Sequence, residues 1–128
     1  MTITGADQVW NRACADQGSL QPCRGDRALS DMLRAHGLVM NGGVHHALVC
    51  LSPDELASAV AGFEYFDLPE VASFLEALPT DPDLGKWTER SEVKANQRYG
   101  RLVPDDDHLV AKFEGVFRKH SEEFAATN

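Results

Sequence analysis

Histidine and cysteine are the residue types in this chain best suited to metal binding or nucleophilic catalysis. His45 and His46 are adjacent, and Cys14, Cys23 and Cys50 are the three cysteines. Adjacent side chains on a helix point about 100° apart, so they seldom bind one ion together, unlike the pair of a His-x-x-x-His motif. The chain contains no such motif and no Gly-x-Ser-x-Gly signature. We therefore expect no metal, cofactor or catalytic residue, with a small metal- or thiol-dependent enzyme centred on His45 and His46 as an alternative.

The segment Asn41-Gly42-Gly43 precedes the two histidines and is the clearest short motif. Glycine adopts positive φ without strain or lets a neighbouring backbone approach closely, and asparagine caps helices and tolerates the left-handed region. The motif therefore predicts a tight turn between two helices, a structural role. An alternative role is the binding of a small anion or peptide by the N–H groups that begin the next helix. No Lys or Arg lies nearby in the chain to reinforce such a site.

Basic residues are missing from a long stretch of the chain, because the next Lys or Arg after Arg34 is Lys86. Acids and bases balance over the rest of the sequence, so the formal net charge of −8 arises from residues 51–83. A surface of one sign repels nucleic acid and acidic membranes and attracts basic proteins. We predict that a basic protein surface is the partner, and that the eight acids of this stretch bind it. They are Asp54, Glu55, Glu64, Asp67, Glu70, Glu76, Asp81 and Asp83.

The same acids have a simpler explanation as the solvated faces of amphipathic helices. Four of them, Asp54, Glu55, Asp67 and Glu70, follow helix-start signals, where a carboxylate interacts favourably with the helix dipole by about 0.3 to 1 kcal/mol. Solvated helix faces normally mix acids with bases, however, because opposite charges one turn apart stabilise a helix. The absence of bases therefore supports a binding face, and both explanations stay open.

A stripe of bases follows the acidic stretch. Lys86, Arg90, Lys94, Arg98 and Arg101 recur every three or four residues, which places them on one face of a helix. The stripe is expected to be solvated or to fold back on the acidic helices of its own domain. Alternatively, it contacts the acidic surface of a second copy and forms a homodimer. Direct binding of nucleic acid is not expected, since that function needs a predominantly basic surface.

Helix signals recur along the whole chain, and strand alternation does not. Ser52-Pro53-Asp54-Glu55 combines a capping hydroxyl, proline at the first helical position and glutamate at the third. We expect an all-α single domain over residues 1–128, with about five to seven helices. The expected helices are 6–16, one capped by Asp26 and stopped at Gly37, a short one after Gly43, one from Pro53, one capped by Asp67, 87–99, and one from Pro104. Residues 79–85 are expected to form an exposed acidic loop.

The overall composition fits a cytoplasmic bacterial-type protein. A chain of 128 residues can bury a self-sufficient core. No apolar run approaches the length of about 18 residues that a membrane span needs, and the first 25 residues lack the apolar core of a signal peptide. Three cysteines without a Cys-x-x-Cys pair are expected to be free thiols.

The pattern of motifs resembles a known family. Asn41-Gly42-Gly43 is followed by Tyr99-x-x-Leu102, Asp106-x-x-Leu109, Phe113 and Phe124. This arrangement is similar to the bacterial all-helical domain of unknown function whose best-known member is an acidic DNA-mimic protein, over roughly residues 20–125. The chain departs from that family in having Val44, His45 and His46 where aromatic residues usually follow the two glycines.

The resemblance implies an acidic helical protein that binds another protein, in one case by occupying the DNA site of a transcription regulator. We therefore expect a non-catalytic protein-binding domain, with a DNA mimic of a regulator or nuclease and a toxin-immunity protein as its two forms. Both forms need an acidic surface directed at a basic cleft, so the sequence alone does not separate them.

Overall fold

The computed structural model describes residues 5–14, 23–79 and 85–126. Within these ranges the chain forms six α-helices and one 3₁₀ helix, and no β-strand. The elements are α1 (Gly5–Cys14), α2 (Arg24–Cys50), α3 (Pro53–Tyr65), α4 (Pro69–Glu76), α6 (Glu89–Leu102), α7 (Asp106–Lys119) and η1 (Ser121–Glu123). The expected all-α fold is confirmed. The expected acidic loop lies mostly outside the described residues, because 80–84 are not among them.

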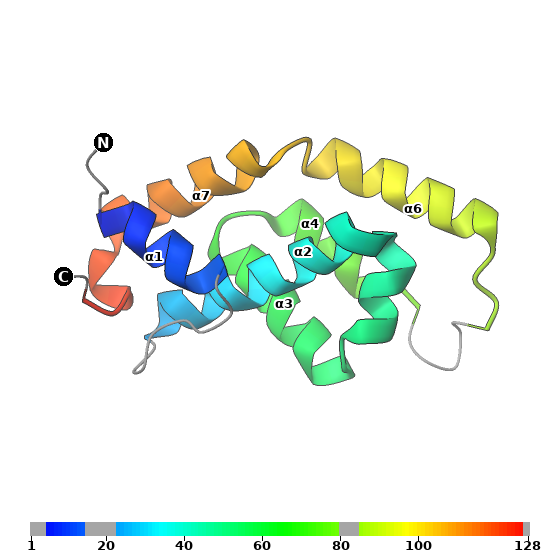
Figure 1. The fold of residues 1–128 in the computed structure, drawn as a ribbon, viewed down its shortest axis with the longest axis horizontal. Helices are drawn as coiled ribbons and strands as arrows, with labels where there is room; N and C mark the ends of the chain where they lie inside the picture. The colour runs from blue at the N-terminus through cyan, green and yellow to red at the C-terminus, as the bar shows by residue number, and fades with distance from the viewer. Residues whose placement is uncertain (1–4, 15–22, 80–84, 127–128) are drawn as a thin grey trace.

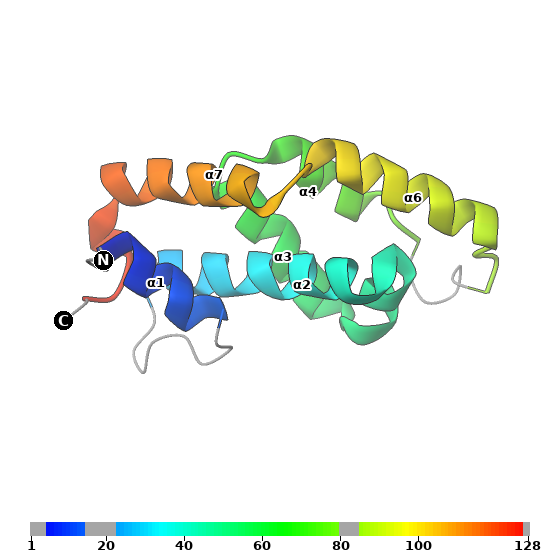
Figure 2. The same cartoon turned by 45° about the horizontal axis from the view of Figure 1, so that its top comes forward.

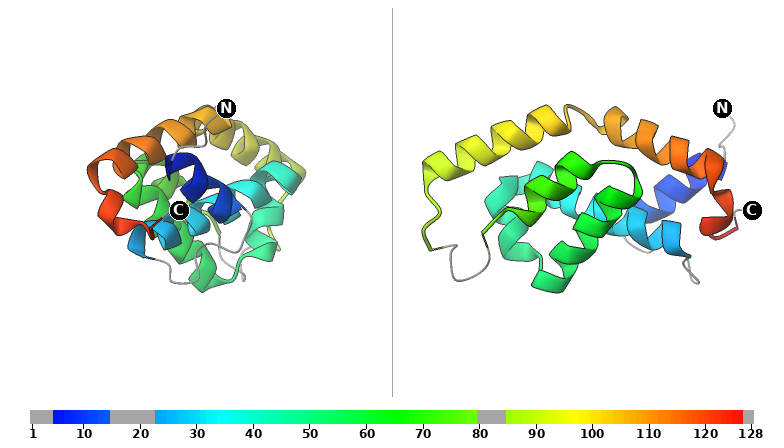
Figure 3. Two further views of the ribbon diagram at one scale, coloured as in Figure 1. Left: turned by 60° about the vertical axis from the view of Figure 1, so that its left-hand side comes forward. Right: turned by 180° about the vertical axis from the view of Figure 1, so that it is seen from behind.

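The helices are arranged around α2, which extends along the long axis of the molecule. Helices α6 and α7 follow one another along one side, and α2, α3 and α4 lie beneath them (Figure 1; Figure 3). Figure 2 shows α1 across the N-terminal half of α2, against which it packs. The first helix and the C-terminal η1 therefore meet at one end of the molecule, while α6 lies toward the other.

The core is built from the apolar faces of the helices and from Phe124 near the C-terminus. Phe113 of α7 is central, since its ring lies 5.6 Å from that of Trp10, 6.1 Å from Phe66 and 5.7 Å from Phe124, measured between centroids. Phe124 is buried beyond the end of α7. The largest fully buried side chains are Phe63, Phe66, Phe113, Leu29, Met32, Leu109, Val9, Val44 and Val71.

Three helix starts carry side-chain caps that satisfy free backbone donors. The N–H of Glu55 donates to Ser52 Oγ at 3.1 Å, and the carboxylate of Glu55 accepts from the Ser52 N–H at 2.9 Å. The start expected from Ser52 and Pro53 is therefore confirmed. Thr88 caps α6 and Asp105 caps α7 in the same way.

Three expected helix boundaries are wrong. The helix does not stop at Gly37, because α2 stays helical through it as far as the kink at Gly43, and a helical glycine costs only about 1 kcal/mol relative to alanine. Asp26 is not the N-cap but the third residue of the helix, which begins at Arg24. Asp67 is likewise not the cap of α4; Leu68 occupies that position, and Asp67 itself adopts a positive φ of 58°.

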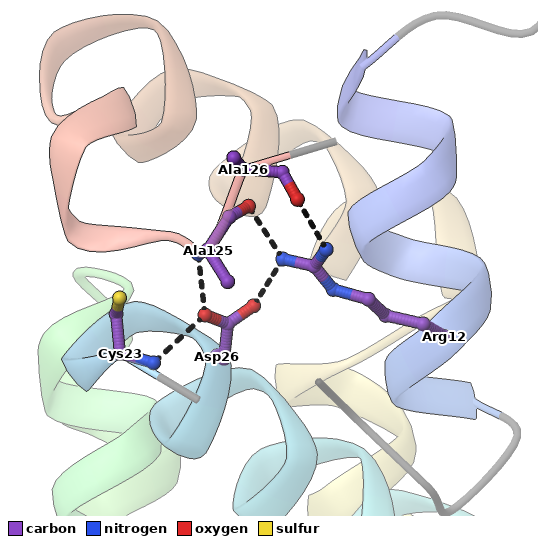
Figure 4. Close-up of polar contacts among 5 residues, drawn as sticks. All are labelled: Arg12, Cys23, Asp26, Ala125 and Ala126. Carbon is purple, nitrogen blue, oxygen red and sulfur yellow. Dashed lines mark hydrogen bonds and ion pairs between the residues drawn. The ribbon is translucent and has the colours of Figure 1, made fainter. Parts of the chain in front are cut away.

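Asp26 instead holds three segments together at the start of α2 (Figure 4). Its carboxylate, 3% exposed, accepts from the Arg12 guanidinium at 2.6 Å, from the Cys23 N–H at 3.0 Å and from the Ala125 N–H at 2.7 Å. Arg12 also donates to the carbonyl of Ala125 at 2.9 Å. We call this arrangement the Asp26 clasp. It joins α1, α2 and the segment after η1, since a buried carboxylate is stable only with a full set of donors.

Candidate functional site

The acidic stretch folds into α3 and α4, which pack against each other. Four of its carboxylates are exposed and form no ion pair with any described residue: Asp54, Glu64, Glu70 and Glu76. Helix periodicity puts Asp54 on the side of α3 opposite Phe63, which faces the core, and Glu64 about 100° from Phe63. We call these four residues the free acids, because their charges have no partner within the described fold.

Two other predicted acids are used by the fold. Glu55 pairs with Arg34 of α2 at 3.0 Å, and its pKa is lowered by the hydrogen bonds from Ser52 and by Arg34. Asp67 lies 3.5 Å from the ammonium group of Lys112 on α7. Both carboxylates are thus already paired, although neither is buried. Asp81 and Asp83, the remaining predicted acids, lie outside the described residues.

Lys and Arg residues from other helices border the acidic surface, although residues 51–83 themselves contain no Lys or Arg. Arg24 lines a hollow with Glu64, and Arg98 lines a groove with Glu70. Together with the pairs made by Arg34 and Lys112, these residues reduce the single-sign surface to the free acids. The gap in the sequence therefore overstates the size of the acidic surface, because helices far apart in the chain pack beside one another.

The basic stripe lies on α6 and in the segment before it. Arg90, Lys94, Arg98 and Arg101 are all exposed, and so is Lys86. None of them forms an ion pair with residues in the described parts of the chain. The stripe is therefore solvated and does not fold back into salt bridges. Only Ala95 and Tyr99 of α6 are fully buried.

The Asn-Gly-Gly motif forms a kink at Gly43 where two helical segments of α2 meet, so the break between helices lies where the sequence placed it. Gly43 has a φ of 91°, which breaks the helix and leaves the next N–H groups without helical acceptors. Helix α6 supplies acceptors: the Val44 N–H donates to Asn96 Oδ1 at 2.9 Å, and the His45 N–H to Glu92 at 3.1 Å. The indole of Trp87 also donates to Glu92, at 3.0 Å.

The anion site expected at the motif is occupied by a residue of the same chain. The freed donors form a small carboxylate-binding site, and the carboxylate of Glu92 accepts their hydrogen bonds. Asn41 and Gly42 are exposed beside it, and Gly43 is half-buried. The motif thus fixes α6 to the bend of α2, which is a structural role.

The side chains of His45 and His46 have different neighbours, as expected for adjacent positions on a helix. The ring of His45 lies 5.9 Å from that of Trp87, between centroids, and His46 lies 3.8 Å from the exposed thiol of Cys50. Among the described residues, a group of three metal-binding side chains forms only at His120, Glu122 and Glu123, so neither of the two histidines belongs to one. His120 and Glu122 are exposed there, and Glu123 also lies 3.8 Å from Arg24.

A polar network that the sequence reasoning missed joins three helices. His36 of α2 is 7% exposed; its Nδ1 lies 2.7 Å from the hydroxyl of Tyr99 on α6, and its Nε2 lies 2.8 Å from Asp106 on α7. Burial and the nearby Asp106 raise the pKa of Tyr99. A signal was present, because His36 is seven residues after Leu29 and thus shares its buried helix face.

The network borders a cavity of about 460 Å³ between α1 and α2. Its lining includes Trp10, Leu33 and Leu38, with Cys14 and Asp106 near the network. Both ring nitrogens of His36 are engaged, and Tyr99 is only 2% exposed, so neither presents a free atom to a substrate. Burial and Asp106 raise the pKa of the Cys14 thiol, which weakens it as a nucleophile. The network therefore orients three helices relative to one another.

Comparison with protein families, with curated proteins and with solved structures gave no match. Within the described ranges, no helix has both the length and the apolar character needed to cross a membrane.

Proposed function

We propose that this protein is a non-catalytic acidic domain that binds a basic protein surface through its free acids on α3 and α4. The observation that supports the proposal is that Asp54, Glu64, Glu70 and Glu76 are exposed and unpaired within the described fold. Exposed carboxylates without a partner keep their full charge available for the Lys and Arg of another protein.

The backbone under these acids is suited to this role. Helices α3 and α4 begin with proline, and α3 has a complete capping box. Their inner faces are held by Phe63, Val71 and Leu75, which are at most 3% exposed. Carboxylates on well-packed helices keep fixed spacings, so little conformational entropy is lost when they pair with a basic surface.

The basic partner is a DNA-binding regulator, a nuclease or a toxin. A DNA mimic would occupy the DNA site of such a protein, as the family resemblance implies, and an immunity protein would block a toxin's basic cleft. The two forms differ in whether DNA competes for the same site. Binding in either form should weaken steeply with salt, because exposed charges are screened beyond a Debye length of about 8 Å at physiological ionic strength.

The first test is capture of a partner by the tagged protein from host lysate at low salt, with elution by a salt gradient and identification by mass spectrometry. We expect a basic protein that is released at moderate salt, and competition by duplex DNA if the partner is a DNA-binding protein. A variant with all four free acids changed to Lys should not capture it.

A matched variant controls for net charge and for helix-dipole effects. Glu89, Asp107, Glu114 and Glu122 lie on α6, α7 and η1, and changing them to Lys alters the net charge as much as changing the free acids does. This variant should retain the partner. Loss of capture in both variants, or in neither, would reject the assignment of the binding face to the free acids.

A further inference from the structure

The surface between α4 and α6 contains a shallow groove with opposite charges on its two sides. The groove has a volume of about 360 Å³ and is lined by Pro69, Glu70, Ser73 and Phe74 from α4 and by Arg98 from α6. Phe74 is half-buried and gives the groove an apolar floor. The two helices are in direct contact along it.

The basic side of the groove continues beyond the residue that lines it, since Lys94 and Arg101 are exposed on α6 one turn to either side of Arg98. On α4, Glu70 is the acid that lines the groove, because Glu76 lies six residues further on and points about 120° away around the helix. No ion pair joins the two sides among the described residues, so the acids of α4 and the bases of α6 both remain free. The carboxylate of Glu70 and the basic row of α6 therefore lie side by side on one face.

A face of this kind is complementary to itself. If a second copy is turned over by a two-fold rotation about an axis along the groove, its α6 comes to lie over the first copy's α4, and the reverse. Glu70 of each copy then comes to the side of Arg98 of the other, because both residues line the same groove. A two-fold axis across the groove would place acids on acids, so charge selects the first arrangement.

We propose that the basic surface bound by Glu70 of α4 is α6 of a second copy, in a symmetric dimer built on the α4–α6 groove. The inference rests on the proposed function, since it names a partner for one of the free acids. The dimer covers Glu70 and leaves Asp54 and Glu64 on α3 exposed. A basic protein that binds all four would therefore compete with dimer formation.

The size of the face sets the expected strength. Helix α6 has 14 residues and α4 has eight, which correspond to lengths of about 21 and 12 Å. Such a patch is near the lower end of specific interfaces, which bury at least about 1,000 Å² in total. We therefore expect a reversible dimer in the micromolar range that weakens as salt increases.

Sedimentation velocity over a range of protein concentrations tests the dimer with two charge-reversal variants. Glu70→Lys and Arg98→Glu should each be monomeric, because each places like charges opposite one another in both halves of the interface. An equal mixture of the two should dimerise, since the introduced lysine of one copy then faces the introduced glutamate of the other, while the native pair remains in the second half. The doubly exchanged variant should dimerise as well.

The control is Arg27→Glu, which changes the charge of an exposed residue in the first turn of α2, outside the groove. It should leave the dimer unchanged. Restoration in the mixture excludes misfolding as the reason for the loss in each single variant. The inference is overturned if the wild-type chain is monomeric at high micromolar concentration and low salt, or if each single variant still dimerises, or if the mixture remains monomeric.

The result also separates this inference from the proposed function. A wild-type monomer that still captures a basic protein through its free acids would remove the dimer alone. A dimer together with no basic partner from the lysate would retain the α4–α6 interface and remove the proposed function.

Discussion

The start of α2 and the surface of α3 and α4 use carboxylates in opposite ways. At the start of α2, Asp26 is 3% exposed and accepts hydrogen bonds from Arg12 and from two backbone N–H groups. On α3 and α4, the free acids are exposed and have no ion-pair partner within the described fold. The first carboxylate stabilises the fold, and the others contribute little to it. The difference shows that charge density along the sequence does not reveal which acids are available to a partner.

The kink of α2, like the Asp26 clasp, uses a carboxylate to stabilise the fold. Glu92 is an acid within the basic stripe of α6, yet its carboxylate is bound by His45 and Trp87. Substitutions at Asp26, Gly43 and Glu92 should therefore change stability, whereas substitutions of the free acids should change binding.

The largest effect is expected from Asp26→Ala. This change leaves the partly buried Arg12 guanidinium and the Ala125 N–H without their acceptor, and breaking a buried ion pair on one side typically costs about 3 to 5 kcal/mol. We expect a decrease of about 3 kcal/mol in the free energy of unfolding by urea. Asp54→Ala is the control and should cost less than about 1 kcal/mol, mainly from the helix dipole. Equal costs at the two positions would contradict the comparison.

The second largest effect is expected from Gly43→Ala. The φ of 91° is unfavourable for alanine, and a Cβ there would meet the Glu92 carboxylate, so the cost should be about 1 to 3 kcal/mol. Gly37→Ala is a control of opposite sign in the same helix. A Cβ at Gly37 meets nothing within 4 Å, and we expect a gain of about 0.5 to 1 kcal/mol. Thermal unfolding of both variants would show whether the two glycines differ in this way.

Glu92→Ala should cost about 1 to 3 kcal/mol, because it leaves the His45 N–H without its acceptor at the kink. The control, Glu89→Ala, changes an exposed acid in the first turn of the same helix and should cost less than about 1 kcal/mol. Hydrogen exchange of the Val44 and His45 amides should accelerate in the Glu92 variant alone. Unchanged exchange would show that α6 does not hold the kink.

The His36 network should make the free energy of unfolding decrease at alkaline pH. The pKa of Tyr99 is raised above the ordinary value of 10.0 by burial and by Asp106, so the unfolded chain loses this proton at a lower pH than the folded chain. The stabilisation is therefore fully present below pH 10 and is lost as the pH rises above it. Tyr99→Phe should lower stability at neutral pH by about 1 kcal/mol and flatten the alkaline decline.

Ultraviolet titration of tyrosinate provides the measurement for that prediction. The chain has two tyrosines, and burial, together with Glu123, raises the pKa of Tyr65 to about 12. Neither residue should therefore ionise near pH 10 in the folded protein. A titration step near pH 10 that disappears in Tyr99→Phe would show that this hydroxyl is not held in the network.

The smallest effect on stability is expected from the free acids. Each single change of Asp54, Glu64, Glu70 or Glu76 to Gln or Asn should alter the free energy of unfolding by about 0.5 kcal/mol or less, as for other exposed positions. Urea unfolding of the four variants is the check. A cost above about 1.5 kcal/mol at any of these positions would place that acid with Asp26 as part of the fold.

Local signals in the sequence predicted much of the fold. The capping box at Ser52 and the helix start expected at Pro104 indicated the right helices, because such start signals depend on neighbouring residues. The helix stop at Gly37 was wrong for a physical reason. A glycine ends a helix when its backbone leaves the helical region, and that change occurs at Gly43.

The candidate site was less predictable, since it depends on contacts between distant segments. Arg34 and Lys112 pair with Glu55 and Asp67 only after α2, α3 and α7 pack together. The sequence therefore indicated eight acids in one surface, and the described structure leaves four of them unpaired. The His36 network escaped for the same reason, because its members are 63 and 70 residues away along the chain.

The most direct test of the account is the affinity of the captured basic partner for two variants, measured by calorimetry at several salt concentrations. One variant carries Lys at the four free acids, and the other carries Lys in place of Glu89, Asp107, Glu114 and Glu122. The account predicts a loss of more than about 100-fold, equivalent to about 2.7 kcal/mol, for the first variant and less than about tenfold for the second. Similar losses in both variants, with circular dichroism showing both folded, would contradict the claim that the free acids form the binding surface.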